Sequence, residues 1–120
     1  MVGYFAKRLK AFGHAFNGIG LLFKDGAHAR IHLLAVLVVS FLAYKLNASS
    51  ADWIHLILCY ALVIGLEALN SAIEYIVDLA SPEYHELAKK AKDVAAAAVL
   101  VAAIGSIIIA LIIFLPYWPF

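Results

Sequence analysis

Apolar residues gather into three long runs along the chain, and short polar segments separate them. A helix needs about 20 mostly apolar residues to cross the hydrocarbon core of a bilayer. The first run, 31–46, is shorter than that, but the long side chains of Arg30 and Lys45 at its ends can reach the membrane surface. The pattern therefore predicts three membrane helices, over 31–46, 53–79 and 82–114.

A different pattern precedes these runs, over residues 4–24. Lys7, Arg8 and Lys10 lie on other faces of the predicted helix than its large apolar residues. Those apolar residues recur every three or four positions: Phe5, Leu9, Phe12, Phe16, Ile19 and Phe23. A core helix of a soluble bundle shows the same periodicity, but bases opposite aromatics are typical of a helix in the membrane interface. We expect an amphipathic surface helix over 4–24, followed by a polar connection at 24–32.

Local signals mark where the longer helices begin. Residues 47–52 are typical of a turn, and Trp53 is placed as an aromatic anchor at the membrane surface. Ser81, Pro82 and Glu83 resemble a helix start, with an N-cap, a first-position proline and an acidic first turn. We therefore expect the third membrane helix to begin at Pro82, outside the bilayer.

Composition supports an all-α membrane protein. Of the 120 residues, 66% are hydrophobic and 14% are charged, whereas soluble domains are about 45–50% apolar. A small soluble fold could not bury this much apolar surface. The net charge of +1 argues against a nucleic-acid partner. Cys59 is the single cysteine, so no disulfide forms within the chain. One domain over 1–120 is the simplest organisation.

The distribution of bases predicts the orientation in the membrane. Every Lys and Arg except Lys45 lies either before the first run or between the second and third. Basic loops remain on the cytoplasmic side of membranes. We therefore expect the N-terminus and the 80–93 connection to be cytoplasmic.

The stretch from 67 to 100 concentrates the acidic residues, although it joins two apolar runs. Glu67, Asn70, Glu74 and Asp78 follow one another at i, i+3, i+7 and i+11. On a helix these positions share an arc of roughly 80°. A stripe of carboxylates that leaves the bilayer core and ends at its surface suits a hydrated cation and the phosphates bound to it.

Glu67 is the most unusual member of this stripe. It lies about 10 Å deeper along the helix than Glu74, at a depth where a charged carboxylate is costly unless it faces a polar cavity, the protein interior or a partner. A carboxylate held there can accept a proton from an alcohol. The alternative is a polar contact between helices, with Asn70 or Ser71.

The remaining polar residues of this stretch suit a phosphorylated ligand. Glu74 and Asp78 lie one turn apart and can approach one Mg²⁺. The alternative is that they are simply hydrated side chains at the end of the helix. Lys92 would present a cation to a nucleotide, and Asp93 is the next residue along the chain. The alternative is that these are ordinary charged residues that flank a membrane helix on its cytoplasmic side. A polar patch near the start of the third membrane helix would contact a base or ribose, or cap the helix: Glu83, Tyr84 and His85. The remaining histidines of the apolar part, His28, His32 and His55, are too scattered for a zinc site.

The whole segment resembles a known family. EALNSAIEYIVDLASPEYHELAKKAKDVAAAAVL, at 67–100, is similar to the signature of the small prokaryotic integral-membrane diacylglycerol kinases, which include undecaprenol kinases. ARIHLLAV at the start of the first run and FLP at the end of the third extend the similarity over nearly the whole chain. The resemblance implies a homotrimer of three-span protomers in the cytoplasmic (inner) membrane, with active sites shared between neighbours. It also implies ATP as co-substrate, Mg²⁺, and a lipid alcohol as acceptor.

The resemblance also assigns roles by position. It implies that Glu67 is the catalytic base, Glu74 the metal ligand that also approaches ATP, and Asn70 and Asp78 supporting residues. The implied nucleotide-binding residues are Lys7, His14, Glu74, Glu83, Tyr84, His85, Lys92 and Asp93. One departure concerns the metal: where the family usually has a second metal-binding glutamate, this chain has Gly26, with Asp25 beside it. Either Asp25 substitutes, or the site has one carboxylate fewer.

These observations together predict an ATP- and Mg²⁺-dependent lipid kinase. The acceptor is either diacylglycerol, giving phosphatidic acid, or undecaprenol, giving undecaprenyl phosphate; the sequence does not choose between them. A proton- or ion-coupled transporter could also use carboxylates inside the membrane, but paired interrupted spans, which many transporters have, are not evident. A structural membrane subunit with incidental charges is a third interpretation.

Overall fold

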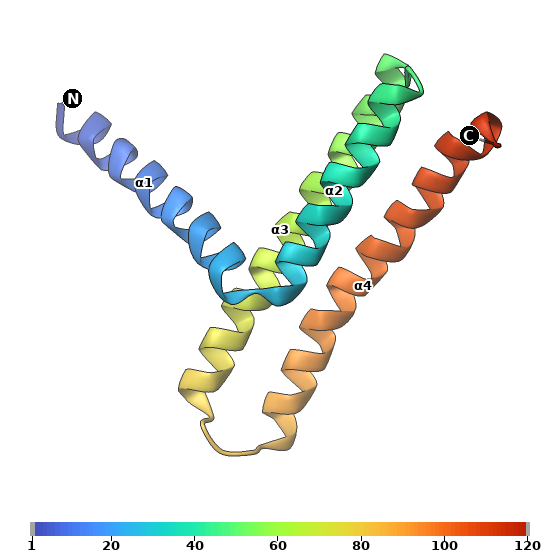
Figure 1. Ribbon diagram of the computed structural model, residues 1–120. Coiled ribbons are helices and arrows are strands. Elements are labelled where there is room, and N and C mark those ends of the chain that lie inside the picture. Colours follow the sequence, from blue (N-terminus) through green and yellow to red (C-terminus); the bar gives the residue numbers. More distant parts are fainter. Residues whose placement is uncertain (1, 120) are drawn as a thin grey trace.

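The chain is entirely helical over the residues that the computed structural model describes, 2–119. It folds as α1 (Val2–Asp25), α2 (Ala27–Lys45), α3 (Ser50–Ala80), α4 (Glu86–Phe114) and a short 3-10 helix, η1 (Leu115–Tyr117). Figure 1 shows α2, α3 and α4 running up and down beside one another, while α1 leaves the group at an angle. The predicted all-α class is confirmed.

Three of these helices are long and apolar enough to cross a membrane: Ala27–Lys45, Ser50–Ala80 and the continuous Glu86–Tyr117 segment. The 19 residues of α2 span about 28 Å, close to the thickness of a bilayer core. The predicted number of membrane helices is therefore confirmed. Many large apolar side chains on them are exposed in the single chain, as expected where lipid rather than water is the neighbour.

The corner between α1 and α2 is tighter than the polar connection expected at 24–32. Gly26 alone separates the two helices. Arg30, in the first turn of α2, reaches back across the corner, and its Nη1 donates hydrogen bonds to the carbonyl oxygens of Phe23 (2.9 Å) and Lys24 (2.8 Å). These carbonyls end α1 and have no partners within the helix. The guanidinium thus stabilises the abrupt end of α1 and lets α2 start directly afterwards.

Gly26 is required by this corner because there is no space for a side chain. A Cβ atom built on Gly26 would lie 2.5 Å from the carbonyl oxygen of Leu22 and 3.2 Å from Cβ of Ala29. A residue with a side chain would force the backbone to move. A glutamate at this position, where the family resemblance leads one to expect it, would require the same backbone movement.

The turn between α2 and α3 ends in a capping box. The backbone N–H of Asp52 donates to Oγ of Ser49 (3.1 Å), and the N–H of Ser49 donates to Oδ2 of Asp52 (3.3 Å). This reciprocal pair satisfies two donors at the helix start. As a result α3 begins at Ser50, three residues before the predicted start at Trp53.

The predicted start of the third membrane helix at Pro82 is wrong. Oγ of Ser81 donates to the carbonyl oxygen of Glu83 (2.9 Å) instead of accepting from a first-turn N–H. The cap comes from His85, whose Nδ1 accepts from the N–H of Leu87 (3.1 Å), so α4 begins at Glu86. Residues 81–85 form a loop between α3 and α4, visible at the bottom of Figure 1.

Candidate active site

Glu67 is buried in the middle of the three long helices. Only 5% of its surface is exposed, and it lines a cavity of about 260 Å³. Nε2 of His32, on α2, lies 3.6 Å from Oε2 of Glu67. His28, one turn earlier on α2, lines the same cavity. Helix α4 contributes apolar side chains to it, among them Val99. The carboxylate therefore lies in a small cavity lined by two histidines and an asparagine on one side and by apolar side chains on the other.

Asn70 shares the cavity with Glu67 and is 9% exposed. Its Oδ1 atom is buried and has no hydrogen-bond partner within the described chain. A buried acceptor without a donor costs free energy, about 1–3 kcal/mol. The cavity has room for a water molecule or a hydroxyl group, so Asn70 offers an unused acceptor close to the carboxylate.

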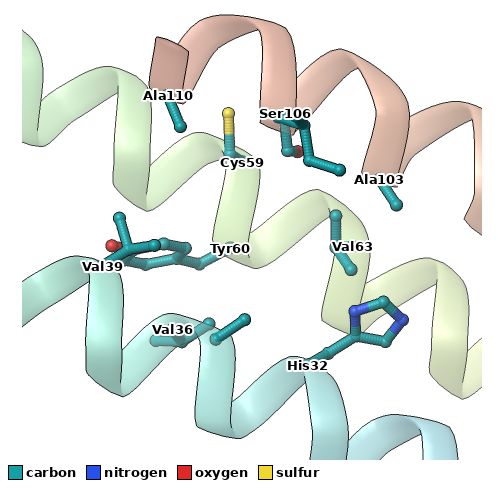
Figure 2. Close-up of a pocket in the computed structure, with 11 residues that line it drawn as sticks. His32, Val36, Val39, Cys59, Tyr60, Val63, Ala103, Ser106 and Ala110 are labelled. Carbon is teal, nitrogen blue, oxygen red and sulfur yellow. The ribbon is translucent and has the colours of Figure 1, made fainter. Parts of the chain in front are cut away.

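A second, apolar cavity adjoins the first. Its volume is about 210 Å³, and it lies between α2, α3 and α4. Figure 2 shows it bordered by valine and alanine side chains, with the ring of His32 at one end. Its hydroxyl groups are satisfied: Ser40 donates to Tyr60 (3.0 Å), and Ser106 donates to the carbonyl of Ala102 (2.8 Å). His32 lines both cavities.

The polar stripe on α3 changes from buried to exposed along its length. Glu67 and Asn70 are buried, whereas Glu74 and Asp78, one and two turns further on, are exposed. Nζ of Lys92, on α4, lies 2.5 Å from Oδ1 of Asp78 and also within electrostatic range of Glu74. Seven residues of helix separate Glu67 from Glu74 along the axis by about 10 Å.

The loop end of the α3–α4 pair holds a third cavity, of about 410 Å³. Six of the residues singled out from the sequence line it: Asp78, Glu83, Tyr84, His85, Lys92 and Asp93. Asp93 is paired with Lys89, at 2.6 Å between Oδ2 and Nζ. We call this the outer cavity, and the Glu67 cavity the inner cavity. The outer cavity combines acids, bases and an aromatic ring in a space open to water.

Asp25 contacts α3 rather than another carboxylate. The hydroxyl of Tyr75 donates to Oδ2 of Asp25 (2.9 Å), and this bond ties the α1–α2 corner to α3. Within residues 2–119, no three His, Cys, Asp or Glu side chains are grouped so as to hold a metal ion. Mg²⁺ usually takes only one or two carboxylates and completes its shell with waters and phosphate oxygens. Glu74 is exposed and suits that limited role.

Lys7 and His14 are not brought into either cavity. Both are exposed on α1, which diverges from the other helices in Figure 1. Neither residue lines the inner or the outer cavity. Within one chain, Lys7 and His14 therefore lie apart from the residues that line these two cavities.

Sequence reasoning missed two contacts. The sequence spacing gives His32 no partner, because the histidines are scattered, yet His32 is the residue that approaches Glu67. Tyr75 was not singled out, yet it binds Asp25. A histidine at the start of an apolar run was the available signal for His32, since such a residue inside a membrane needs a polar neighbour.

Three membrane-spanning helices around a buried carboxylate define an integral membrane protein with a polar site inside its helix bundle. Residues 13–114 match the sequence profile of the prokaryotic diacylglycerol kinases. The chain is 40% identical over 107 residues to an undecaprenol kinase of Bacillus subtilis (strain 168), covering 89% of this chain and 87% of that protein. It is 38% identical over 104 residues to a diacylglycerol kinase of Escherichia coli (strain K12), covering 87% of this chain and 85% of that protein.

The chain belongs to the prokaryotic diacylglycerol kinase family. It is a membrane phosphotransferase with an alcohol as acceptor, as the names of these relatives indicate. A diacylglycerol kinase of Helicobacter pylori (strain ATCC 700392 / 26695) is a further relative, 36% identical over 98 residues, covering 81% of this chain and 76% of that protein.

Proposed function

We propose that this protein transfers the γ-phosphate of ATP to the hydroxyl group of a membrane lipid alcohol, with Mg²⁺ as the metal. One observation carries the proposal: helix α3 lines two different environments. Toward its middle, Glu67 is buried in the inner cavity, which adjoins the apolar cavity. At its end, the same helix lines the exposed, charged outer cavity. The first environment suits a hydroxyl attached to hydrocarbon, and the second suits a nucleotide in water.

Glu67 acts as the general base. The acceptor hydroxyl enters the inner cavity, where Asn70 Oδ1 lies without a partner, and its hydrocarbon occupies the adjoining apolar cavity. The hydroxyl oxygen forms a bond to the γ-phosphorus, the bond from that phosphorus to the β–γ bridging oxygen breaks, and the hydroxyl proton passes to Glu67. ADP leaves on the water side. Phosphoryl transfer depends mainly on such positioning and on charge neutralisation.

The outer cavity binds the nucleotide. Lys92 and Lys89 supply positive charge for the phosphates, while Glu83, Tyr84 and His85 supply polar and aromatic contacts for the ribose and base. Glu74 would hold the metal, and Asp25, which binds the neighbouring Tyr75, would supply a second carboxylate. A metal held there would supply positive charge against the negative charge that develops on the transferred phosphoryl group. Asp78 orients Lys92 through their ion pair.

The assembly completes the site. We propose a homotrimer in the prokaryotic cytoplasmic membrane, with the N-terminus and the α3–α4 loop in the cytoplasm. Helix α1 lies on the membrane surface as an amphipathic helix, which is supported by its exposed aromatic residues and its bases. In that arrangement Lys7 and His14 would contact a nucleotide bound to a neighbouring protomer, since they do not reach the cavities of their own chain.

The acceptor is a diacylglycerol or undecaprenol, the substrates in the names of the relatives. Purified protein in mixed micelles, given ATP labelled in the γ-phosphate and each alcohol separately, tests the proposal. We expect Mg²⁺-dependent label in phosphatidic acid or undecaprenyl phosphate, with a clear preference for one. Transfer to neither alcohol would contradict the proposed function.

A further inference from the structure

His32 is the polar side chain that approaches the buried Glu67 from another helix. Nε2 of His32 lies 3.6 Å from Oε2 of Glu67, and the two side chains are 24% and 6% exposed. We propose that His32 is a positioning residue for Glu67, whose ring N–H directs one carboxylate oxygen and leaves the other for the acceptor hydroxyl. This inference rests on the proposed role of Glu67 as base.

The distance fits a contact that tightens during the reaction. At 3.6 Å the two atoms are too far apart for a hydrogen bond. Catalytic hydrogen bonds are often long before a substrate binds and shorten in the complex. An acceptor that enters the inner cavity would displace solvent and favour the shorter contact, because polar interactions are stronger where water is excluded.

The surroundings leave His32 as the natural donor to this carboxylate. Among the described residues that line the inner cavity, those of α4 carry no side-chain donor. Asn70, on the same helix as Glu67, has an amide donor, but the polar group that approaches the carboxylate from another helix is His32. His28, on the same helix as His32, is the other titratable group on the cavity wall. His28 forms none of the ion pairs found among the described residues, whereas His32 does.

The location of His32 also links the binding of the acceptor to the alignment of Glu67. Its ring lies at the boundary between the inner cavity and the apolar cavity of Figure 2. A hydrocarbon chain in the apolar cavity would therefore pass His32 before its hydroxyl reaches Glu67. Binding of the acceptor and alignment of the carboxylate would be coupled through this one ring.

The test compares two substitutions at the same position. His32→Leu removes the donor with a small loss of volume, whereas His32→Gln places an amide N–H near the position of Nε2. We expect His32→Leu to lower kcat by about 10- to 100-fold, the range typical of losing a residue that orients a catalytic group. His32→Gln should recover kcat to within about fivefold of the unaltered protein. The KM for ATP should change by less than about twofold in both, because ATP binds in the outer cavity.

His55→Leu is the matched control. His55 lies near the start of α3, where its Nδ1 contacts the carbonyl oxygen of Ala51 at 2.7 Å within the same helix, so activity should be unchanged. Equal losses in His32→Leu and His32→Gln would assign His32 a packing role and overturn the proposal. Normal kcat in His32→Leu would overturn it as well.

Difference infrared spectroscopy separates this proposal from the proposed function. The carboxyl stretching band of Glu67 is assigned by its loss in Glu67→Gln, and it is then followed during a pH titration. We expect the band to shift in His32→Leu and to stay in place in His55→Leu. A band unaffected by His32→Leu would overturn the pairing even if the kinase is active; absence of transfer in the unaltered protein would contradict the function and leave this spectroscopic result standing.

Discussion

Lys92 on α4 and Asp78 on α3 form an ion pair in which Nζ and Oδ1 are 2.5 Å apart. The pair joins the two helices beside the outer cavity, which both residues line. Exposed ion pairs contribute little to stability, about 0–1 kcal/mol. The pair therefore matters more for holding the ammonium group next to the nucleotide than for holding the fold together.

Replacing Lys92 tests that interpretation. Lys92→Ala should raise the KM for ATP and lower kcat/KM by about 10²- to 10³-fold, since a cation positioned on transferring phosphate is worth several kcal/mol in the transition state. The thermal midpoint should change by less than a few degrees. Steady-state kinetics and thermal unfolding in detergent would measure both. Lys90→Ala, which removes a base paired with Glu86 at 3.7 Å and absent from the outer cavity lining, is the control. Comparable loss in both variants would mean that only general charge is needed.

The Gly26 corner should not tolerate a side chain. Gly26→Ala places a Cβ atom 2.5 Å from a backbone carbonyl oxygen, and we expect a loss of about 1–3 kcal/mol as the corner opens. Denaturant unfolding in micelles and limited proteolysis of the 24–30 segment would detect it. Gly20→Ala is the control on α1, since nothing lies within 4 Å of its added Cβ and alanine favours helix there. If Gly26→Ala were as stable as Gly20→Ala, the corner would not be as tight as described.

The Asp25 carboxylate should influence the Mg²⁺ requirement. Asp25→Asn removes the charge but keeps an oxygen that can accept from Tyr75, so the link between Asp25 and α3 is retained. We expect the Mg²⁺ concentration for half-maximal activity to rise about 10-fold, as for loss of one carboxylate near a metal that keeps most of its waters. Metal titrations of the initial rate provide the measurement, with Glu86→Gln as an exposed acidic control. An unchanged Mg²⁺ requirement would mean that Asp25 does not replace the metal-binding glutamate expected at position 26, and that the metal site has one carboxylate fewer.

Several features of the fold were predictable because they depend on periodicity within one segment. The number of membrane helices followed from three apolar runs. The shared face of Glu67, Asn70, Glu74 and Asp78 followed from helical spacing, and the structure buries its first two members and exposes the last two. Membrane depth is a linear property of a helix, so it can be estimated from residue numbers.

Other features depend on contacts between helices, which one sequence does not specify. The pairing of His32 with Glu67 requires the register of α2 against α3, and the Asp25–Tyr75 bond requires the direction in which α1 turns. The end of α1 is stabilised by Arg30 from the following helix. His85 displaced Ser81 as the cap of α4 because the hydroxyl of Ser81 bonds to the Glu83 carbonyl instead. Local propensity favoured Ser81 and could not reveal this competition.

The assignment of the base can be tested in one preparation that reports nucleotide binding and phosphoryl transfer together. Glu67→Gln keeps the shape of the side chain and removes its ability to accept a proton. We expect ATP affinity within about twofold of the unaltered protein, because Glu67 lies about 10 Å along the helix from Glu74, and transfer to the lipid alcohol reduced by about 10²- to 10⁴-fold. Lipid phosphorylation by Glu67→Gln at the unaltered rate would contradict the account.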